Sequence, residues 1–313
     1  MLTNYKRYQS LLTLTFLAAC SNVQIKNANI LLPEALPIVA AKSERPLVGL
    51  ALGSGGNRGF AHIGVIKILE ENNIPVDLVA GTSAGSVVGA LYAGGFHATE
   101  LEQLALNLDE KGLRDFEFSI HGYIRGERLQ DFINQALKNR SIEQLDKPFA
   151  ALATDLTSGK IYAFNHGNTG LAVRASSSIP GVFQPVTIKD SKYVDGALKN
   201  PVPVNIAHQM GADIVIAVDV SQQILGSSDN PNILEILTQS LRIMRQKLTD
   251  DDISSAEIVI RPLIGVETDV NSVSKEKMIL AGEAAALAAL PLIRDLIKKR
   301  ALEKFQSHSA PHS

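Results

Sequence analysis

The chain has 313 residues, of which 45% are hydrophobic and 20% charged, an ordinary globular composition with enough material for one large α/β core. Its formal net charge of −2 gives no strong attraction to nucleic acid, and the lack of tryptophan argues against a platform that stacks bases. No cluster of His, Cys and Asp has the spacing of a metal site, so the sequence predicts no metal and no other cofactor.

The N-terminal residues 1–19 have the pattern of a signal peptide. Two basic residues precede an apolar stretch, Leu11 to Ala19, which is too short to span a bilayer. The stretch closes on Leu17-Ala18-Ala19-Cys20, which resembles the lipobox of bacterial lipoproteins, with an ordinary secretory signal as the alternative. The resemblance implies that Cys20, the only cysteine, carries palmitate or a similar acyl chain as the first mature residue.

Residues 20–46 lack clean periodicity and are predicted to be a lipidated tether. Ser21, rather than an aspartate, follows the lipobox cysteine. By resemblance to such lipoproteins, we expect a lipid anchor in the bacterial cell envelope, at the outer membrane and facing the periplasm.

A glycine-rich loop, Gly53 to Gly59, follows the buried strand Leu47–Leu52 and precedes a helix. Its backbone N–H groups predict an anion site at a helix N-terminus. A phosphate-binding P-loop is excluded because Gly-Lys-Ser/Thr is missing. A dinucleotide fingerprint has Arg58 where its third glycine should be, but Asp77 has roughly the spacing of the ribose-binding acid, so this alternative stays open. The third possibility is the oxyanion of an acyl-transfer reaction.

A serine lies at the apex of the next strand–turn–helix segment. Gly81-Thr82-Ser83-Ala84-Gly85 follows the apolar strand Val76–Ala80 and precedes the apolar helix Ser86–Tyr92. This context predicts a nucleophile elbow, with the positive end of the helix dipole near the reacting oxygen. The alternative is a turn whose serine only caps the helix.

A third motif, Tyr193-Val194-Asp195-Gly196-Ala197, is a short strand that ends in an Asp-Gly turn. The glycine-rich loop, GxSxG and Asp-Gly-Ala, in this order, resemble the patatin-like phospholipase family. The stretches Leu52–Val65 and Ala175–Phe183 resemble its bacterial branch, and the resemblance covers about Leu47 to Gly211.

The resemblance implies a three-layer α/β fold with a mostly parallel central sheet and helices on both faces. It makes Ser83 the nucleophile and Asp195 the proton acceptor of a Ser–Asp dyad. It also assigns the oxyanion loop and the motif glycines: Gly55, Gly56 and Arg58; Gly81 and Gly85; Gly196 and Ala197. Ser54 departs from the pattern, because the family has a glycine there.

The implied function is a serine esterase, a phospholipase or lysophospholipase that forms an acyl-enzyme on a lipid or lysophospholipid substrate. A thioesterase or acyltransferase of the same fold, and a nucleotide-binding α/β protein, are the alternatives. Ser83, Asp195 and His208 also follow the chain order of an α/β-hydrolase triad. However, His208 falls within a predicted helix interior, so we predict a dyad whose aspartate has a pKa raised by desolvation.

The rest of the chain alternates between predicted helices and strands, which favours a mostly parallel sheet covered on both faces. The sequence predicts a catalytic core over 47–211, a further α/β part of the same domain over 212–306, and a disordered tail over 307–313. The oligomeric state is not predicted. The expected elements are helices at Thr99–Leu108, Arg125–Lys138, Ile233–Lys247 and Lys275–Phe305, and strands at Phe149–Thr154, Gly159–Phe164, Ala212–Asp219 and Glu257–Arg261.

Overall fold

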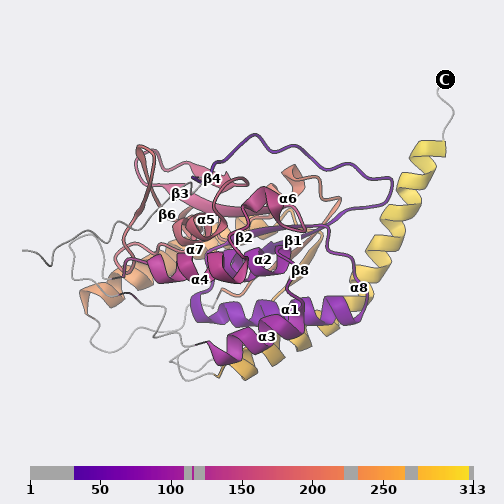
Figure 1. Ribbon diagram of the computed structural model, residues 1–313. Helices are drawn as coiled ribbons and strands as arrows, with labels where there is room; N and C mark the ends of the chain where they lie inside the picture. The colour runs from indigo at the N-terminus through magenta and orange to yellow at the C-terminus, as the bar shows by residue number, and fades with distance from the viewer. Residues whose placement is uncertain (1–31, 109–114, 116–123, 222–231, 265–273, 310–313) are drawn as a thin grey trace, which may run out of the picture. The chain divides into compact units, whose positions relative to one another are not determined.

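A single mixed sheet forms the centre of the computed structural model, which describes residues 32–108, 115, 124–221, 232–264 and 274–309 (Figure 1). The strand order is β5-β6-β3-β2-β1-β7-β8, and β4 pairs with β3 outside this path. Strands β3, β2, β1, β7 and β8 are parallel to one another, whereas β4, β5 and β6 join by antiparallel pairs. The strands are β1 Val48–Leu52, β2 Leu78–Thr82, β3 Phe149–Asp155, β4 Ile161–Phe164, β5 Val186–Ile188, β6 Ser191–Asp195, β7 Ile214–Val218 and β8 Ile258–Ile260.

Helices cover both faces of this sheet. Along β1, Leu50 and Leu52 join one apolar cluster and Ala51 joins the other, because alternate side chains of a strand point to opposite faces. Figure 1 shows α1 and α3 on one side of β1 and β2, and α6 on the other. This arrangement confirms the predicted three-layer α/β class. The helices are α1 Phe60–Glu71, α2 Ala84–Ala93, α3 Ala98–Asn107, α4 Glu127–Ala136, α5 Thr169–Ser176, α6 Val204–Gln209, α7 Ile233–Ile253 and α8 Lys275–Ser309, with short 3-10 turns η1 Gly56–Gly59, η2 Ile142–Gln144 and η3 Gly196–Leu198.

Strands β2 and β6 lie on the same edge of β3. Ala153 pairs with both β4 and β6, and Ala151 pairs with both β4 and β2. Because a strand has only two edges, β4 occupies one of them and β2 and β6 share the other. Thr82 lies opposite Leu152 and Asp195 lies opposite the next residue, Ala153, so the carboxyl ends of β2 and β6 meet.

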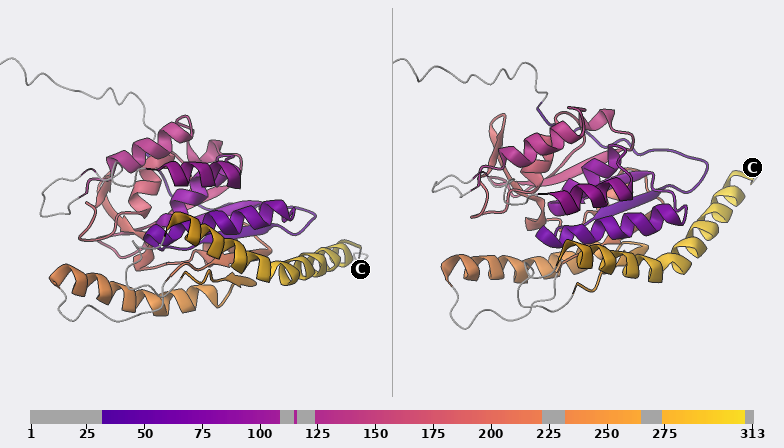
Figure 2. Two further views of the ribbon diagram at one scale, coloured as in Figure 1. Left: turned by 90° about the horizontal axis from the view of Figure 1, so that it is seen from below. Right: turned by 60° about the horizontal axis from the view of Figure 1, so that its bottom comes forward.

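The long helix α8 packs against α1 and changes direction along its length (Figures 1 and 2). Pro291 lies inside it, where a proline removes one backbone hydrogen bond of the helix. The helix continues to Ser309, past residue 307, where the sequence predicts the start of a disordered tail. Among the helices that the structure describes, none is both long enough and apolar enough to cross a membrane.

The segment 32–46 lies on the core, although the sequence predicts a tether as far as residue 46. Glu34 forms a β-bridge with His166, and the Ala41 N–H donates to the carbonyl of Met210 over 2.9 Å. These backbone contacts correct the expected tether for this part of the chain. The predicted signal peptide, Cys20 and the rest of the tether lie outside the described residues.

Candidate active site

Ser83 occupies a strained turn between β2 and α2. Its backbone has φ 55° and ψ −122°, a left-handed conformation that a residue with a Cβ rarely adopts. The turn is also closely packed, because a Cβ at Gly85 would lie 2.1 Å from the carbonyl oxygen of Leu52. The Ser83 side chain does not cap α2. The structure therefore supports the elbow and not the capping alternative.

The side chains of Ser83 and Asp195 meet where β2 and β6 end. The Ser83 hydroxyl donates to Asp195 Oδ2 over 2.6 Å, and the Ala197 N–H donates to Asp195 Oδ1 over 2.8 Å. Both Ser83 and Asp195 are buried, with 5% and 4% of their surface exposed. Gly196 allows this approach, since a Cβ there would lie 2.3 Å from the carbonyl oxygen of Leu152. The two predicted dyad residues are thus in direct contact.

The buried environment of Asp195 raises the affinity of its carboxylate for a proton. Burial raises the pKa of this carboxyl from 3.8 to about 6, against the lowering effect of the hydrogen bonds from Ser83 and Ala197. A carboxylate with its proton affinity raised in this way can accept a proton from a hydroxyl near neutral pH. The site is thus a serine hydroxyl that is hydrogen-bonded to a buried carboxylate with a raised pKa.

The glycine-rich loop lies directly beside the elbow. A Cβ at Gly59 would come within 2.7 Å of the Cβ of Ala84, the residue after Ser83. Gly55 lies against Val220, and Gly56 has φ 57° with open space where a side chain would stand. Backbone N–H groups at such a place can hold an oxyanion that develops next to the serine.

Arg58 connects the glycine-rich loop to the segment that follows β7. Its Nε donates to the carbonyl of Val220 over 2.7 Å, and only 7% of the residue is exposed. Desolvation lowers its pKa to about 10, so the guanidinium remains charged at neutral pH. The contact with Val220 indicates that Arg58 restrains the glycine-rich loop.

His62 also supports the glycine-rich loop, which the sequence does not reveal. It is fully buried, and its Nε2 lies 2.8 Å from the carbonyl oxygen of Gly53, so that nitrogen must carry the proton. Burial lowers the pKa of this imidazole to about 4 and keeps it neutral. In the sequence, the only indication that His62 is buried is its place next to Ile63 in the apolar helix α1.

His208 does not join the dyad. It lies on α6, and its Nδ1 and Nε2 are each 3.2 Å from a carbonyl oxygen, those of Ala212 and Ser255. Nε2 also lies 3.5 Å from the Glu257 carboxylate. The structure therefore does not support a catalytic triad of Ser83, Asp195 and His208. Within the described residues, no group of three His, Cys, Asp or Glu side chains could hold a metal ion.

We expect His208→Ala to leave the rate of hydrolysis of an activated ester within about threefold of wild type, because neither ring nitrogen contacts Ser83 or Asp195. The initial rate on a short p-nitrophenyl ester at pH 7.5 measures this, with circular dichroism to check folding. A 10³-fold fall of the initial rate in a folded variant would show that the triad hypothesis is right.

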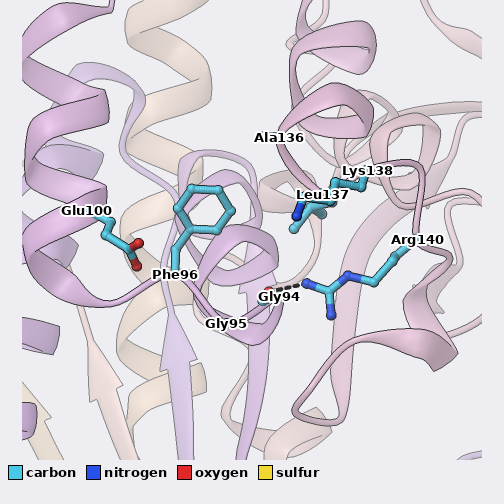
Figure 3. Close-up of a pocket in the computed structure, with 8 residues that line it drawn as sticks. All are labelled: Gly94, Gly95, Phe96, Glu100, Ala136, Leu137, Lys138 and Arg140. Carbon is cyan, nitrogen blue, oxygen red and sulfur yellow. Dashed lines mark hydrogen bonds between the residues drawn. The ribbon is translucent and has the colours of Figure 1, made fainter.

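A separate pocket lies at the far end of α2 (Figure 3). It is lined by Gly94, Gly95, Phe96, Glu100, Ala136, Leu137, Lys138 and Arg140. Because α2 starts directly after Ser83 and has ten residues, this pocket is about 15 Å along the helix from the dyad. The Arg140 guanidinium already donates to the carbonyl of Gly94 and pairs with Asp146. We therefore place the candidate active site at the elbow.

Comparisons with known proteins match the same part of the chain. A family model described as patatin-like phospholipase matches residues 50–208, which include both dyad residues. An uncharacterized NTE family protein of Mycobacterium tuberculosis is 37% identical over 206 residues, 64% of this chain and 56% of that protein. Human patatin-like phospholipase domain-containing protein 6 is 36% identical over 184 residues, 56% of this chain and 13% of that protein.

Among solved structures, VipD from Legionella pneumophila has a TM-score of 0.53 at 12% identity, covering 88% of this chain and 72% of that one. At this identity the likeness shows the fold alone. The chain spans little more than half the length of the mycobacterial relative and a small part of the human one.

Proposed function

Because this chain belongs to the patatin-like phospholipase family, we propose that it is a serine hydrolase that cleaves acyl esters of phospholipids or lysophospholipids. The observation that carries the proposal is the 2.6 Å hydrogen bond from the Ser83 hydroxyl to the buried Asp195 carboxylate. The names of two relatives, human patatin-like phospholipase domain-containing protein 6 and neuropathy target esterase sws of Drosophila melanogaster, support an ester substrate that is a lipid.

The proposed reaction has two steps. Ser83 Oγ attacks the ester carbonyl while its proton passes to Asp195 Oδ2, and the N–H groups of Gly55 and Gly56 donate to the developing oxyanion. Asp195 then gives the proton to the departing alcohol, which leaves an acyl group on Ser83. In the second step, Asp195 takes a proton from a water that attacks the acyl carbonyl, and returns it to Ser83 Oγ as the free acid leaves, which restores the starting enzyme.

The direct test is the release of fatty acid from defined lipids. We expect the protein to hydrolyse phosphatidylcholine or lysophosphatidylcholine, and Ser83→Ala, which keeps the fold, to release none. An acyl-CoA thioester and an added alcohol acceptor serve as competing substrates for the thioesterase and acyltransferase alternatives. Faster turnover of the thioester, or transfer to the alcohol in place of hydrolysis, would assign the same acyl-enzyme to one of these alternatives.

The nucleotide-binding alternative has less support. It requires a free Asp77 carboxylate for a ribose hydroxyl, but this carboxylate accepts from the Val48 N–H over 2.8 Å and pairs with Arg45. A rise in melting temperature with ATP or NAD would support it, since a ligand that binds only the folded state stabilises that state. We expect no such rise.

Replacement of Gly56 by valine tests the oxyanion loop. We expect a fall of roughly 10²–10³-fold in the rate on a p-nitrophenyl ester, because a β-branched residue at φ 57° must move the backbone and its N–H away from the oxyanion. Gly159→Val is the matched control, since Gly159 also has positive φ and open space but lies in the β3–β4 turn. Equal melting temperatures and equal rates for the two variants would remove this loop from the mechanism.

We further propose that Cys20 is acylated and anchors the protein to the envelope, at the outer membrane. The support is the Leu17-Ala18-Ala19-Cys20 sequence alone. We expect intact-mass spectrometry of protein extracted from membranes to show a mature N-terminus at Cys20 with added acyl mass. Cys20→Ser should retain the signal peptide and lack this mass, whereas cleavage at another residue would rule the anchor out.

A further inference from the structure

The segment at the end of α5 contacts the backbone of both dyad residues. The Ser83 N–H donates to Ser176 Oγ over 2.9 Å, and the Asp195 N–H donates to the carbonyl oxygen of Ser178 over 2.9 Å. Helix α5 ends at Ser176 and packs on β3, β6 and α2 (Figure 1). One short piece of the stretch Ala175–Phe183, to which the sequence assigns no role, therefore contacts the peptide groups of the nucleophile and of the proposed base.

This segment has a fixed position in the core. Ser176 and Ser178 are fully buried. The Ser178 hydroxyl donates to the carbonyl of Arg174 over 2.8 Å, and the Ser178 N–H donates to the carbonyl of Ala175 over 3.3 Å, so the hydrogen bonding of α5 continues past its last residue. A side chain on such a support can fix the position of the group that it binds.

The Ser83 N–H lies beyond the strand pairing of β2. This strand ends at Thr82, and its paired residues reach Gly81 on the β1 side and Thr82 on the β3 side. A buried N–H without an acceptor is unfavourable, and a φ of 55° at a serine persists only where surrounding contacts enforce it. Ser86 Oγ donates to the Ser83 carbonyl over 2.7 Å on one side of this residue, and the Ser176 hydroxyl binds its N–H on the other.

We propose that Ser176 is a positioning residue of the active site: its hydroxyl binds the Ser83 N–H and thereby keeps Ser83 Oγ within hydrogen-bond distance of Asp195. The carbonyl of Ser178 fixes the backbone of Asp195 from the same segment. The hydrogen bond of Ser176 is to the backbone of the nucleophile and not to its hydroxyl. This inference rests on the proposed function, because it assigns a further residue to the same site.

Ser176→Ala removes the acceptor and keeps the Cβ. We expect kcat on p-nitrophenyl butyrate to fall about 10²-fold, because a displacement of about 1 Å in a reacting group can lower the rate by this factor. KM should stay within about threefold of wild type, since the substrate does not contact Ser176. Covalent labelling by a fluorophosphonate, a reagent for activated serines, should slow by a similar factor. Circular dichroism and the melting temperature check folding.

The pH profile of the variant separates positioning from a general loss of stability. Burial raises the pKa of Asp195 to about 6, against the hydrogen bond from Ser83, which lowers it. If Ser176→Ala weakens this hydrogen bond, the pKa of Asp195 rises further, and the midpoint of the kcat/KM profile should move from about pH 6 to higher pH. Arg245 of α7, whose charge also acts on Asp195, is unchanged in this variant.

Two variants of the same region are the matched controls. Thr169→Val removes a buried hydroxyl at the opposite end of α5, where it donates to the carbonyl of Arg140 over 2.8 Å. Thr169 lies about 10 Å from Ser176 along the helix. Ser177→Ala removes the neighbouring hydroxyl, which has no hydrogen-bond partner among the described residues. Both controls should keep the kcat and the pH midpoint of wild type.

A folded Ser176→Ala protein with the kcat and the pH midpoint of wild type would overturn the proposal. Equal losses of kcat in Ser176→Ala and Thr169→Val would also overturn it, because they would assign the effect to the stability of α5. If Ser176→Ala does not fold, Ser176→Cys replaces it, since a thiol fills the space and is a weak acceptor. That variant should also lose kcat, and a wild-type kcat would contradict the role of Ser176.

Failure of this inference is distinguishable from failure of the proposed function. Wild-type protein that neither hydrolyses an ester nor reacts with the fluorophosphonate would contradict the proposed function, and this inference with it. Active wild-type protein beside an equally active Ser176→Ala variant would contradict this inference alone.

Discussion

Ser83→Ala is expected to lower kcat for ester hydrolysis by at least ~10⁴-fold, because it removes the atom that attacks the carbonyl. The variant should also lose covalent labelling by a fluorophosphonate, which reacts with activated serines. Its melting temperature should stay near that of wild type, since alanine keeps the Cβ and loses only one hydroxyl. Labelling followed by intact-mass measurement reads the loss directly.

Ser177→Ala is the matched control for this variant. Ser177 is also buried, at 9% exposed, and its hydroxyl has no hydrogen-bond partner among the described residues. It should label and turn over like wild type. Turnover by a folded Ser83→Ala protein, or equal labelling of Ser83→Ala and wild type, would contradict the nucleophile.

Asp195→Asn is expected to be similarly inactive, because an amide cannot take the serine proton. In wild-type protein, kcat/KM should rise tenfold per pH unit below pH 6 and level off above it, since the pKa of Asp195 is raised to about 6 and only the ionised form is a base. Initial rates on a neutral ester between pH 4.5 and 8.5 measure this profile. A flat profile through this range would exclude Asp195 as the base.

Asp195→Asn should also change stability in the opposite direction to activity. The folded state raises the pKa of Asp195, so it holds the proton more tightly than the unfolded state, and wild type loses stability as pH rises from about 4 through 6. The loss approaches about 3 kcal/mol at most, at about 1.4 kcal/mol for each tenfold change in proton affinity. Asparagine does not ionise, so the variant should be more stable than wild type at pH 8.

Asp252→Asn separates this effect from burial of a carboxyl in general. Desolvation also raises the pKa of Asp252 to about 6, but this residue contacts Asn200 and Val202 in place of Ser83. Its variant should keep the pH profile of wild-type kcat/KM. A profile that moves with Asp252 and not with Asp195 would assign the titration to α7.

The local motifs could be predicted from the sequence because small residues in a strand–turn–helix context have few alternatives. Ser83 and the loop around Gly56 lie where short-range patterns place them, next to each other at the carboxyl ends of β1 and β2. The α/β class follows from the same alternation of strands and helices. The lipobox at Cys20 stays a prediction.

Features that depend on distant contacts could not be predicted in the same way. Asp195 became a candidate only through the order of three motifs, since Asp-Gly is a common turn. The periodicity of α7 indicates an amphipathic helix but not which side meets the core. The packing of residues 32–46 has no periodic signal, because it consists of scattered contacts, such as the backbone bonds to His166 and Met210 and the ion pair of Arg45 with Asp77.

Because β2 and β6 meet on one edge of β3, the reactivity of Ser83 reports whether the sheet has folded. Ser83 and Asp195 are 112 residues apart in the chain, and neither strand alone can bring them together. Closing such a loop is slow relative to forming local helices. During refolding, fluorophosphonate labelling should therefore appear only when the third strand has paired with both partners. Brief exposure to the fluorophosphonate at successive times of refolding would measure when the sheet is complete.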